Sequence, residues 1–293
     1  MVLMKKRHRS AWATELNDIV RGACGGFLFG IPLLYTMEVW WVGSTAQPPR
    51  IMMAIAGTFI AVFWLNRTEG FRRTRRSRPY EAFMDTVEAM AIGLLCAALV
   101  LLLLRELTFD TSLREALGKV IFESVPFALG VALAGHFLGD TREAEPPPDD
   151  RSQLKTEAAG SLNATLADIG ATLIGAIVIG FNISPTDEIP MVAAAVSAPW
   201  LLSIIVASLL ISYGIVFEAG FSDQRKRRQQ QGIFQQPLSE TVMSYLVSLV
   251  AAVIMLWFFE RLTLSDPWTM WLEQTLLLGL PATIGGAAGR LTL

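Results

Sequence analysis

Eight apolar stretches dominate the chain, and most of them match the length of about 20 residues that a helix needs to cross a lipid bilayer. Lipid offers no hydrogen-bond partner to backbone groups, so these stretches are expected to be helices. They run over residues 19–43, 51–65, 83–104, 117–138, 166–183, 189–217, 241–259 and 268–288. The sixth stretch is long enough either to tilt in the membrane or to contain a break near Pro199.

The composition agrees with a membrane protein. Of the 293 residues, 53% are hydrophobic and 17% are charged, whereas an average soluble domain carries about 25% charged residues. A formal net charge of −2 gives no basic excess for binding nucleic acid. Cys24 and Cys96 lie inside apolar stretches and away from histidine, so no metal or redox pair is expected. The predicted fold is an all-α, polytopic membrane helix bundle whose partner is the lipid bilayer.

The distribution of Lys and Arg predicts the orientation. With eight membrane-spanning helices, 19 of the 24 Lys and Arg residues fall on one side, and the exceptions are Arg50, Arg105, Arg114, Lys119 and Arg261. Basic loops stay on the cytoplasmic side, so both termini are expected there, in a multi-pass protein of the bacterial cytoplasmic membrane. The basic segments 71–79 and 224–231 adjoin helix ends. We interpret them as topology determinants that meet anionic lipid rather than nucleic acid.

The two halves of the chain align with each other, which indicates an internal duplication. Residues 17–71 overlie 167–221 at a shift of 150, and residues 85–135 overlie 240–290 at a shift of 155. Matched residues include Asp18/Asp168, Gly25/Gly175, Gly30/Gly180, Glu38/Glu188, Pro126/Pro281 and Gly130/Gly285. Each half has four helices, so both halves start on the same side. Two repeats in parallel orientation are therefore expected around an axis along the membrane normal.

The duplication predicts four parts. Residues 1–17 are expected to form a cytoplasmic N-terminal tail, and residues 18–138 the first four-helix repeat. Residues 139–160 would be a cytoplasmic linker, and residues 161–293 the second four-helix repeat. Prolines and mixed charges in the linker are typical of an exposed connection.

Each half carries a threonine and a glutamate beyond a helix-interrupting residue in its first helix. These are Thr36 and Glu38 in the first half and Thr186 and Glu188 in the second. A rise of about 1.5 Å per residue puts both glutamates in the outer part of the membrane. One interpretation is a symmetric pair of carboxylates that attracts cations or carries protons. The other is a pair of acids that lie in water at the outer interface.

Glu123 is expected to lie deeper, well inside the fourth stretch. A carboxylate facing lipid there would be costly, so this side chain should face the protein interior. Lys119 precedes it by four residues and could pair with it. Glu123 is therefore either a group that acts in transport or part of a structural buried pair. Leu278 takes its place in the second half, so the charge is asymmetric.

The string GIPLLYTMEVWW, at residues 30–41, accompanies the eight helices and the central linker rich in proline and acidic residues. Together these features resemble a bacterial family of integral membrane proteins of the domain-of-unknown-function type. The resemblance covers most of the chain and implies an integral membrane location. It implies no activity, ligand or catalytic residue.

These features favour a channel or secondary transporter for a small ion, either a cation or a proton, that uses the paired carboxylates. The alternative is a non-transporting membrane scaffold or accessory subunit, and a homo-oligomer is compatible with either. An enzyme is not expected, because the sequence has no HExxH, Walker-type loop, GxSxG or histidine cluster. No cofactor and no metal are expected either.

Overall fold

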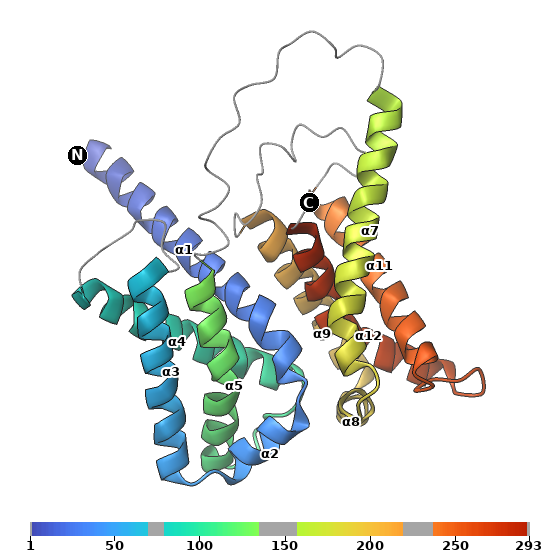
Figure 1. Cartoon of the computed structure of the whole chain (residues 1–293), viewed down its shortest axis with the longest axis horizontal. Helices are drawn as coiled ribbons and strands as arrows, with labels where there is room; N and C mark the ends of the chain where they lie inside the picture. Colours follow the sequence, from blue (N-terminus) through green and yellow to red (C-terminus); the bar gives the residue numbers. More distant parts are fainter. Residues whose placement is uncertain (1, 70–78, 135–156, 219–236, 292–293) are drawn as a thin grey trace. The chain divides into compact units, whose positions relative to one another are not determined.

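The structure is a computed structural model and describes residues 2–69, 79–134, 157–218 and 237–291. Within these ranges it is helical and contains no β-strand. The chain divides into two compact units, the first mainly Met1–Phe137 and the second Leu138–Ala193 with Ser197–Leu293. Figure 1 draws the helices in colours that follow the sequence.

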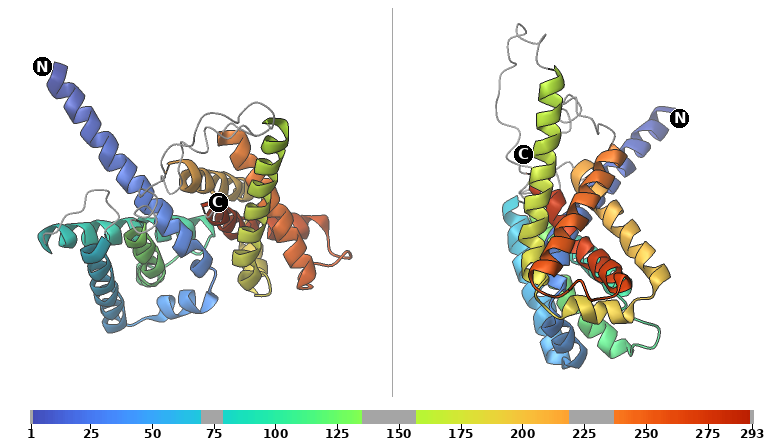
Figure 2. Two further views of the ribbon diagram at one scale, coloured as in Figure 1. Left: turned by 45° about the horizontal axis from the view of Figure 1, so that its top comes forward. Right: turned by 90° about the vertical axis from the view of Figure 1, so that its right-hand side faces the viewer.

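Five helices make up the described part of the first unit. They are α1 (Val2–Leu34), α2 (Met37–Thr45), α3 (Pro48–Glu69), α4 (Pro79–Leu103) and α5 (Leu113–Leu133). The segment 1–17 that we expected as a tail is helical from Val2 onward, and Figure 2 shows this part of α1 projecting from the other helices of the unit. Its place in the cytoplasm stays a prediction.

The first apolar stretch is not one continuous helix. α1 ends at Leu34, and α2 leaves it at an angle of 92°. Pro32 lies in the last turn of α1, and Thr36 has the extended backbone angles φ −132° and ψ 96°. A proline removes one helical hydrogen bond and clashes with the preceding turn, which explains why the helix ends here.

Helix α5 is the centre of the first unit and contacts α1, α2, α3 and α4. Small residues allow these close contacts. Gly130 of α5 lies against Gly25 of α1, and Ala128 of α5 lies against Gly93 of α4. The middle of α5 is thus in contact with several helices, and its polar residues Glu123 and Ser124 are buried there.

The second unit has a similar order of long and short helices. It contains α7 (Glu157–Ile183), α8 (Glu188–Ala195), α9 (Ala198–Tyr213) with the π-helical turn η1 (Gly214–Glu218), α11 (Pro237–Phe258) and α12 (Trp268–Leu291). The break predicted near Pro199 is confirmed, because α8 ends at Ala195 and α9 begins at Ala198. Helix α7 begins inside the segment 139–160 that we expected as a linker, and residues 139–156 lie outside the described residues.

Helix α12 is the centre of the second unit. It contacts α7, α9, α11 and η1, and every residue from Gln274 to Ala287 is buried. Gly285 lies against Gly175 of α7, and Gly289 lies against Ala171. A helix buried on all sides is a core helix of its unit.

Six helices of the described residues are long and apolar enough to cross a membrane, and the bent pair of α1 and α2 would make a seventh span. They are parts of α3, α4, α5, α7, α9 with η1, and α11. Helix α12 is not among them, because glycine and polar side chains interrupt its apolar sequence. The chain is thus a multi-pass membrane protein, whereas eight spans, two repeats and cytoplasmic termini stay predictions.

Helices α4 and α11 end in the same way. Arg105 has φ 63° and Glu260 has φ 56°, both in the left-handed region. The backbone N–H of the residue that follows each of them donates to the carbonyl oxygen five residues earlier. In the first unit, the Glu106 N–H donates to the Leu101 carbonyl oxygen at 2.9 Å. This hydrogen-bond pattern is a Schellman motif, in which the left-handed residue is usually glycine.

Candidate functional site at the bend between α1 and α2

Helix α5 passes the bend between α1 and α2 and packs against both helices. On one side of the bend, Phe127 of α5 lies against Gly30 of α1. On the other side, a Cβ added to Gly43 of α2 would stand 3.0 Å from the carbonyl oxygen of Gly118. The part of α5 between Gly118 and Phe127 therefore lies at the level of the bend.

Glu123 lies in this part of α5. Its side chain is 1% exposed, and its Oε1 atom has no hydrogen-bond partner. A buried carboxylate without a partner is strongly disfavoured, so this group needs a proton or a cation. The burial of this side chain confirms the expectation that Glu123 faces the protein interior.

Trp40 of α2 carries another buried polar atom without a hydrogen-bond partner. Its ring is 1% exposed, and its Nε1–H has no acceptor. Trp40 precedes Gly43 by one helical turn, so both residues share the face of α2 that contacts α5. An unpartnered donor on α2 and an unpartnered acceptor on α5 thus lie on two helices in contact.

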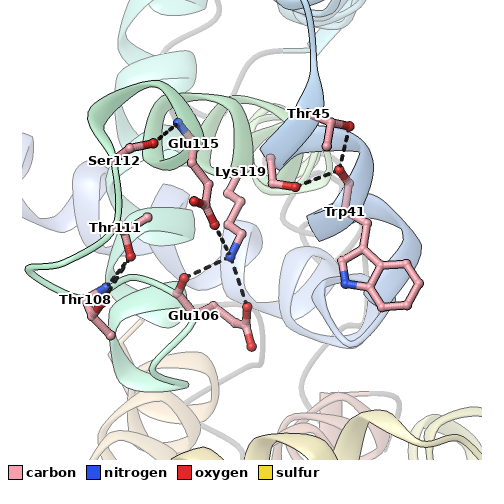
Figure 3. Close-up of polar contacts among 9 residues, drawn as sticks. Trp41, Thr45, Glu106, Thr108, Thr111, Ser112, Glu115 and Lys119 are labelled. Carbon is pink, nitrogen blue, oxygen red and sulfur yellow. Dashed lines mark hydrogen bonds and ion pairs between the residues drawn. The ribbon is translucent and has the colours of Figure 1, made fainter.

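Lys119 binds two other glutamates (Figure 3). Its ammonium nitrogen lies 3.1 Å from Glu115 Oε1 and 3.3 Å from Glu106 Oε2, and it also donates to the Glu106 carbonyl oxygen at 3.2 Å. It makes no ion pair with Glu123. The pair that the spacing of Lys119 and Glu123 suggested is therefore wrong, because the turn before α5 brings Glu106 within closer reach.

Thr36 and Glu38 lie at the bend itself. Thr36 precedes α2 at the N-cap position, and its side chain makes no capping hydrogen bond. Glu38 lies in the first turn of α2 and is exposed in its unit. A carboxylate at this position interacts favourably with the N-terminal end of a helix dipole.

Thr186 and Glu188 lie at the corresponding break of the second unit, between α7 and α8. The Thr186 hydroxyl donates to the Ile183 carbonyl oxygen at 2.6 Å, and Glu188 is 6% exposed. Between them, Asp187 forms an ion pair of 2.8 Å with Arg261, which also donates to the Pro185 carbonyl oxygen. Arg261 thus fixes the break between α7 and α8 to the segment that follows α11.

The structure places Thr36 and Glu38 at the bend of the first unit and Glu123 on the part of α5 at the level of this bend. Thr186 and Glu188 lie at the break between α7 and α8 of the second unit. The pairing of Glu38 with Glu188 across the two units stays a prediction. Sequence reasoning missed Trp40. Trp40 precedes Gly43 by three residues, and this spacing is the sequence signal that could have identified Trp40 as the buried tryptophan. The neighbouring Trp41 is 62% exposed.

Within the ranges that the structure describes, no group of three or more His, Cys, Asp or Glu side chains could hold a metal ion. The candidate site therefore consists of one buried acid, one indole N–H and the ends of an interrupted helix. Such a set can bind and release a proton, or hold a small cation with the help of backbone carbonyls.

Comparison with known protein families gives a match over most of the chain. The model of a family described as "Putative integral membrane protein (DUF2391)" matches residues 18–293. The chain belongs to the DUF2391 family. The match covers the helices of both units from Asp18 onward, and it confirms the family resemblance drawn from residues 30–41. Searches of curated proteins and of solved structures gave no match.

Proposed function

We propose that this protein is a channel or secondary transporter that moves a small cation or a proton across the bacterial cytoplasmic membrane. The observation that carries the proposal is the buried Glu123 carboxyl at the level of the bend between α1 and α2. A carboxyl group in such a place is stable when it is protonated or bound to a cation. Exchange of that proton or cation with the two sides of the membrane would be the transport step.

The bend adds ligands to the acid. The last carbonyl groups of α1 have no partner in a continuing helix, because the chain turns by 92° after Leu34. In many transporters, interrupted helices supply such carbonyls to ions near the middle of the membrane. The bend next to Glu123 therefore favours a binding site over a purely structural role.

Glu38 and Glu188 are proposed as acids that attract cations to the outer side. They stand at the same position of the two proposed repeats, each in the first turn of a short helix after a break. Their proposed pairing requires that both face the axis between the repeats. In that case two nearby carboxylates would raise the local concentration of cations.

The proposed topology has eight spans, two parallel repeats and cytoplasmic termini. Equivalent contacts within each unit support the duplication. Gly25 lies against Gly130, and Gly175, 150 residues after Gly25, lies against Gly285, 155 residues after Gly130. The two proposed repeats thus use the same pair of positions to bring their first and last helices together.

Flux measurements on reconstituted protein test the proposal. We expect the parent protein in liposomes to conduct protons or one of the alkali-metal cations above the level of protein-free liposomes. Glu123→Gln removes the charge with little change in shape and should abolish this flux. Glu81→Gln, at the start of α4 and away from the bend, is the matched control and should conduct like the parent.

Two results would overturn the proposal: a folded parent protein that carries none of these ions, or a folded Glu123→Gln variant with parental flux. The double variant Glu38→Gln/Glu188→Gln tests the outer acids separately. If they act together, its flux at low cation concentration should fall below that of either single variant. Parental flux of the folded double variant would remove both residues from the mechanism.

The second candidate function is a membrane scaffold or accessory subunit. The tight glycine contacts of α5 and α12 favour it, because such contacts hold helices in one fixed arrangement. A well-folded protein without flux in the experiment above would support this function instead.

A further inference from the structure

Several buried side-chain oxygens of the second unit make no hydrogen bond, and three of them belong to the residue after α7 and to the first half of α12. They are Ser184 Oγ, Gln274 Oε1 and Thr275 Oγ1. Their residues are 0%, 4% and 8% exposed, so the missing partner is not bulk water. Buried polar atoms without a partner are rare in native proteins and point to a bound water or ion.

Five other buried hydroxyls of this unit are hydrogen-bonded within their own helices. Each donates to the carbonyl oxygen four residues earlier, which is the usual arrangement in membrane helices. These residues are Thr172, Ser208, Thr241, Ser248 and Thr283. The three unpartnered oxygens thus differ from these five hydroxyls, which find an acceptor within their own helix. The hydroxyls of Ser212 and Tyr245 also lack partners. Tyr245 lies far from Ser184, because the preceding residue, Ser244, contacts Thr172 of α7. Thr172 is about 18 Å along α7 from Ser184.

The contacts between α7 and α12 place the three oxygens at one level. Gly175 of α7 meets Gly285 of α12, and further along α7 a Cβ on Gly180 would stand 4.0 Å from Leu278. As the residue numbers of α7 increase, those of α12 decrease, so the two helices are antiparallel.

One more turn in each direction leads to the unpartnered oxygens. Ser184 follows Gly180 by four residues, and Gln274 and Thr275 precede Leu278 by four and three residues. Both of these α12 positions flank the line of residues that faces α7. The serine hydroxyl, the amide and the threonine hydroxyl therefore lie at the end of α7, where the chain breaks before α8.

The chemistry of this place suits a singly charged metal ion. Hydroxyl, amide and carbonyl oxygens are neutral ligands of the kind that replaces the hydration shell of an alkali-metal cation, whereas Ca²⁺ and Mg²⁺ depend on carboxylates. Glu188 is buried in the first turn of α8, four residues after Ser184 in the chain. The positive charge of Arg261 is balanced by its ion pair with Asp187.

The first unit has a fixed positive charge at the matching position. At the shift of 155 residues, Gln274 corresponds to Lys119, whose ammonium group binds Glu106 and Glu115. The second unit has a neutral amide at this position, so the residue that corresponds to Lys119 contributes an oxygen ligand instead of a positive charge.

We propose that the second unit binds a dehydrated alkali-metal cation through Ser184 Oγ, Gln274 Oε1 and Thr275 Oγ1 at the break between α7 and α8. This site is distinct from Glu123. The site binds its ion whether or not the protein transports ions. Cation binding to it can therefore be measured independently of flux, in addition to the proposed transport function.

Thermal unfolding of the purified full-length protein in detergent tests the site. Unfolding is measured in choline chloride and in the chlorides of Li⁺, Na⁺, K⁺, Rb⁺ and Cs⁺ at equal ionic strength. At least one alkali-metal cation should raise the Tm in a saturable way, since a ligand bound only to the folded state stabilises it. Equal Tm values in all of these salts would overturn the proposal and would favour a bound water.

Variants locate the ion. Gln274→Leu and Ser184→Ala should each weaken apparent cation affinity by about tenfold or more, as expected for loss of one hydrogen-bond-like contact to a charge. Thr283→Val is the matched control, because the Thr283 hydroxyl already bonds to the Gly279 carbonyl oxygen, and it should keep parental affinity. Parental affinity in both Gln274→Leu and Ser184→Ala would overturn the assignment of ligands.

Two direct measurements of cation binding test the site independently of the ligand variants. Equilibrium binding of radioactive Na⁺ and Rb⁺ to the parent protein should show one saturable site per chain, whether or not the variants fold, and absence of binding would refute the site. Glu123→Gln should keep this binding even if it loses flux. Loss of flux with retained binding therefore separates failure of the proposed transport role from failure of the cation site.

Discussion

Gly25 of α1 and Gly130 of α5 lie backbone against backbone, and a Cβ atom added to Gly25 would stand 2.6 Å from the carbonyl oxygen of Gly130. We expect Gly25→Ala to destabilise the protein by about 1–3 kcal/mol, because overpacking forces the helices apart. The loss should appear as a lower Tm in detergent. Gly57→Ala is the control, since nothing lies within 4 Å of its Cβ position. It should leave the Tm unchanged or raise it, and a Gly25→Ala variant that melts like the parent would contradict the close contact.

Lys119→Met should destabilise the first unit by about 1–3 kcal/mol, because Glu106 loses its cation while its side chain is only 16% exposed. Adding Glu106→Gln should recover part of this loss. A double-mutant cycle on the unfolding transition measures the coupling between the two side chains. The control is Arg114→Met, whose exposed bond to Gln47 should matter by less than about 0.5 kcal/mol. Strictly additive effects of the Lys119 and Glu106 changes would argue against the ion pair.

Glu260→Gly should stabilise the end of α11. Glu260 is exposed and has φ 56°, and glycine adopts this conformation without the steric cost of a Cβ atom. The expected gain is about 0.5–1 kcal/mol, seen as a raised Tm. Glu260→Ala removes the same charge but keeps the Cβ atom, so it should give no such gain. Equal effects of the two variants would mean that backbone strain is not the cause.

The turn between α11 and α12 should respond to acid. Asp266 Oδ2 accepts hydrogen bonds from the N–H and the hydroxyl of Thr263 at 2.6 and 2.8 Å, and these bonds lower the pKa of Asp266 below its ordinary value. Because a lowered pKa means that the folded turn favours the carboxylate, its contribution is present above about pH 3.9. It is lost as the pH falls through the lower folded-state pKa. A carboxyl-carbon NMR titration of Asp266 checks this, and an ordinary midpoint would contradict it.

Substituted-cysteine labelling tests the eight-span topology. Cysteines at Thr111 and Ser265, in the segments after α4 and α11, should react with a membrane-impermeant reagent from outside. Ser77 and Gln230 lie outside the described residues and should react only from inside. The native Cys24 and Cys96 are buried and should stay silent. Labelling of Ser77 and Ser265 from the same side would refute the eight-span arrangement.

Much of the fold could be predicted from sequence because apolar length and proline act locally. The membrane class, the helices α3, α4, α5 and α11, and the break near Pro199 all follow from which residues stand next to one another. The 92° turn after α1 was indicated only as an interruption, since its angle depends on how α2 packs on α5. The central role of α12 also depends on neighbours that are distant in sequence.

The candidate site shows the same limit. Spacing favoured a pair between Lys119 and Glu123, which are four residues apart on one helix. In the structure Lys119 binds Glu106, thirteen residues away, because the left-handed Arg105 turns the chain back toward α5 at the end of α4. The loss of this partner leaves Glu123 unpaired, which spacing alone could not reveal.

The burial of α12 from Gln274 to Ala287 has a consequence for how the protein is made. A segment with so many glycines and polar groups gains little from leaving the translocon for lipid on its own. Its preferred surroundings are α7, α9 and α11, all of which precede it in synthesis. We therefore expect α12 to insert last, by packing against helices of its unit that are already in the bilayer. Contacts with these helices, rather than with lipid, would then stabilise α12 in the membrane.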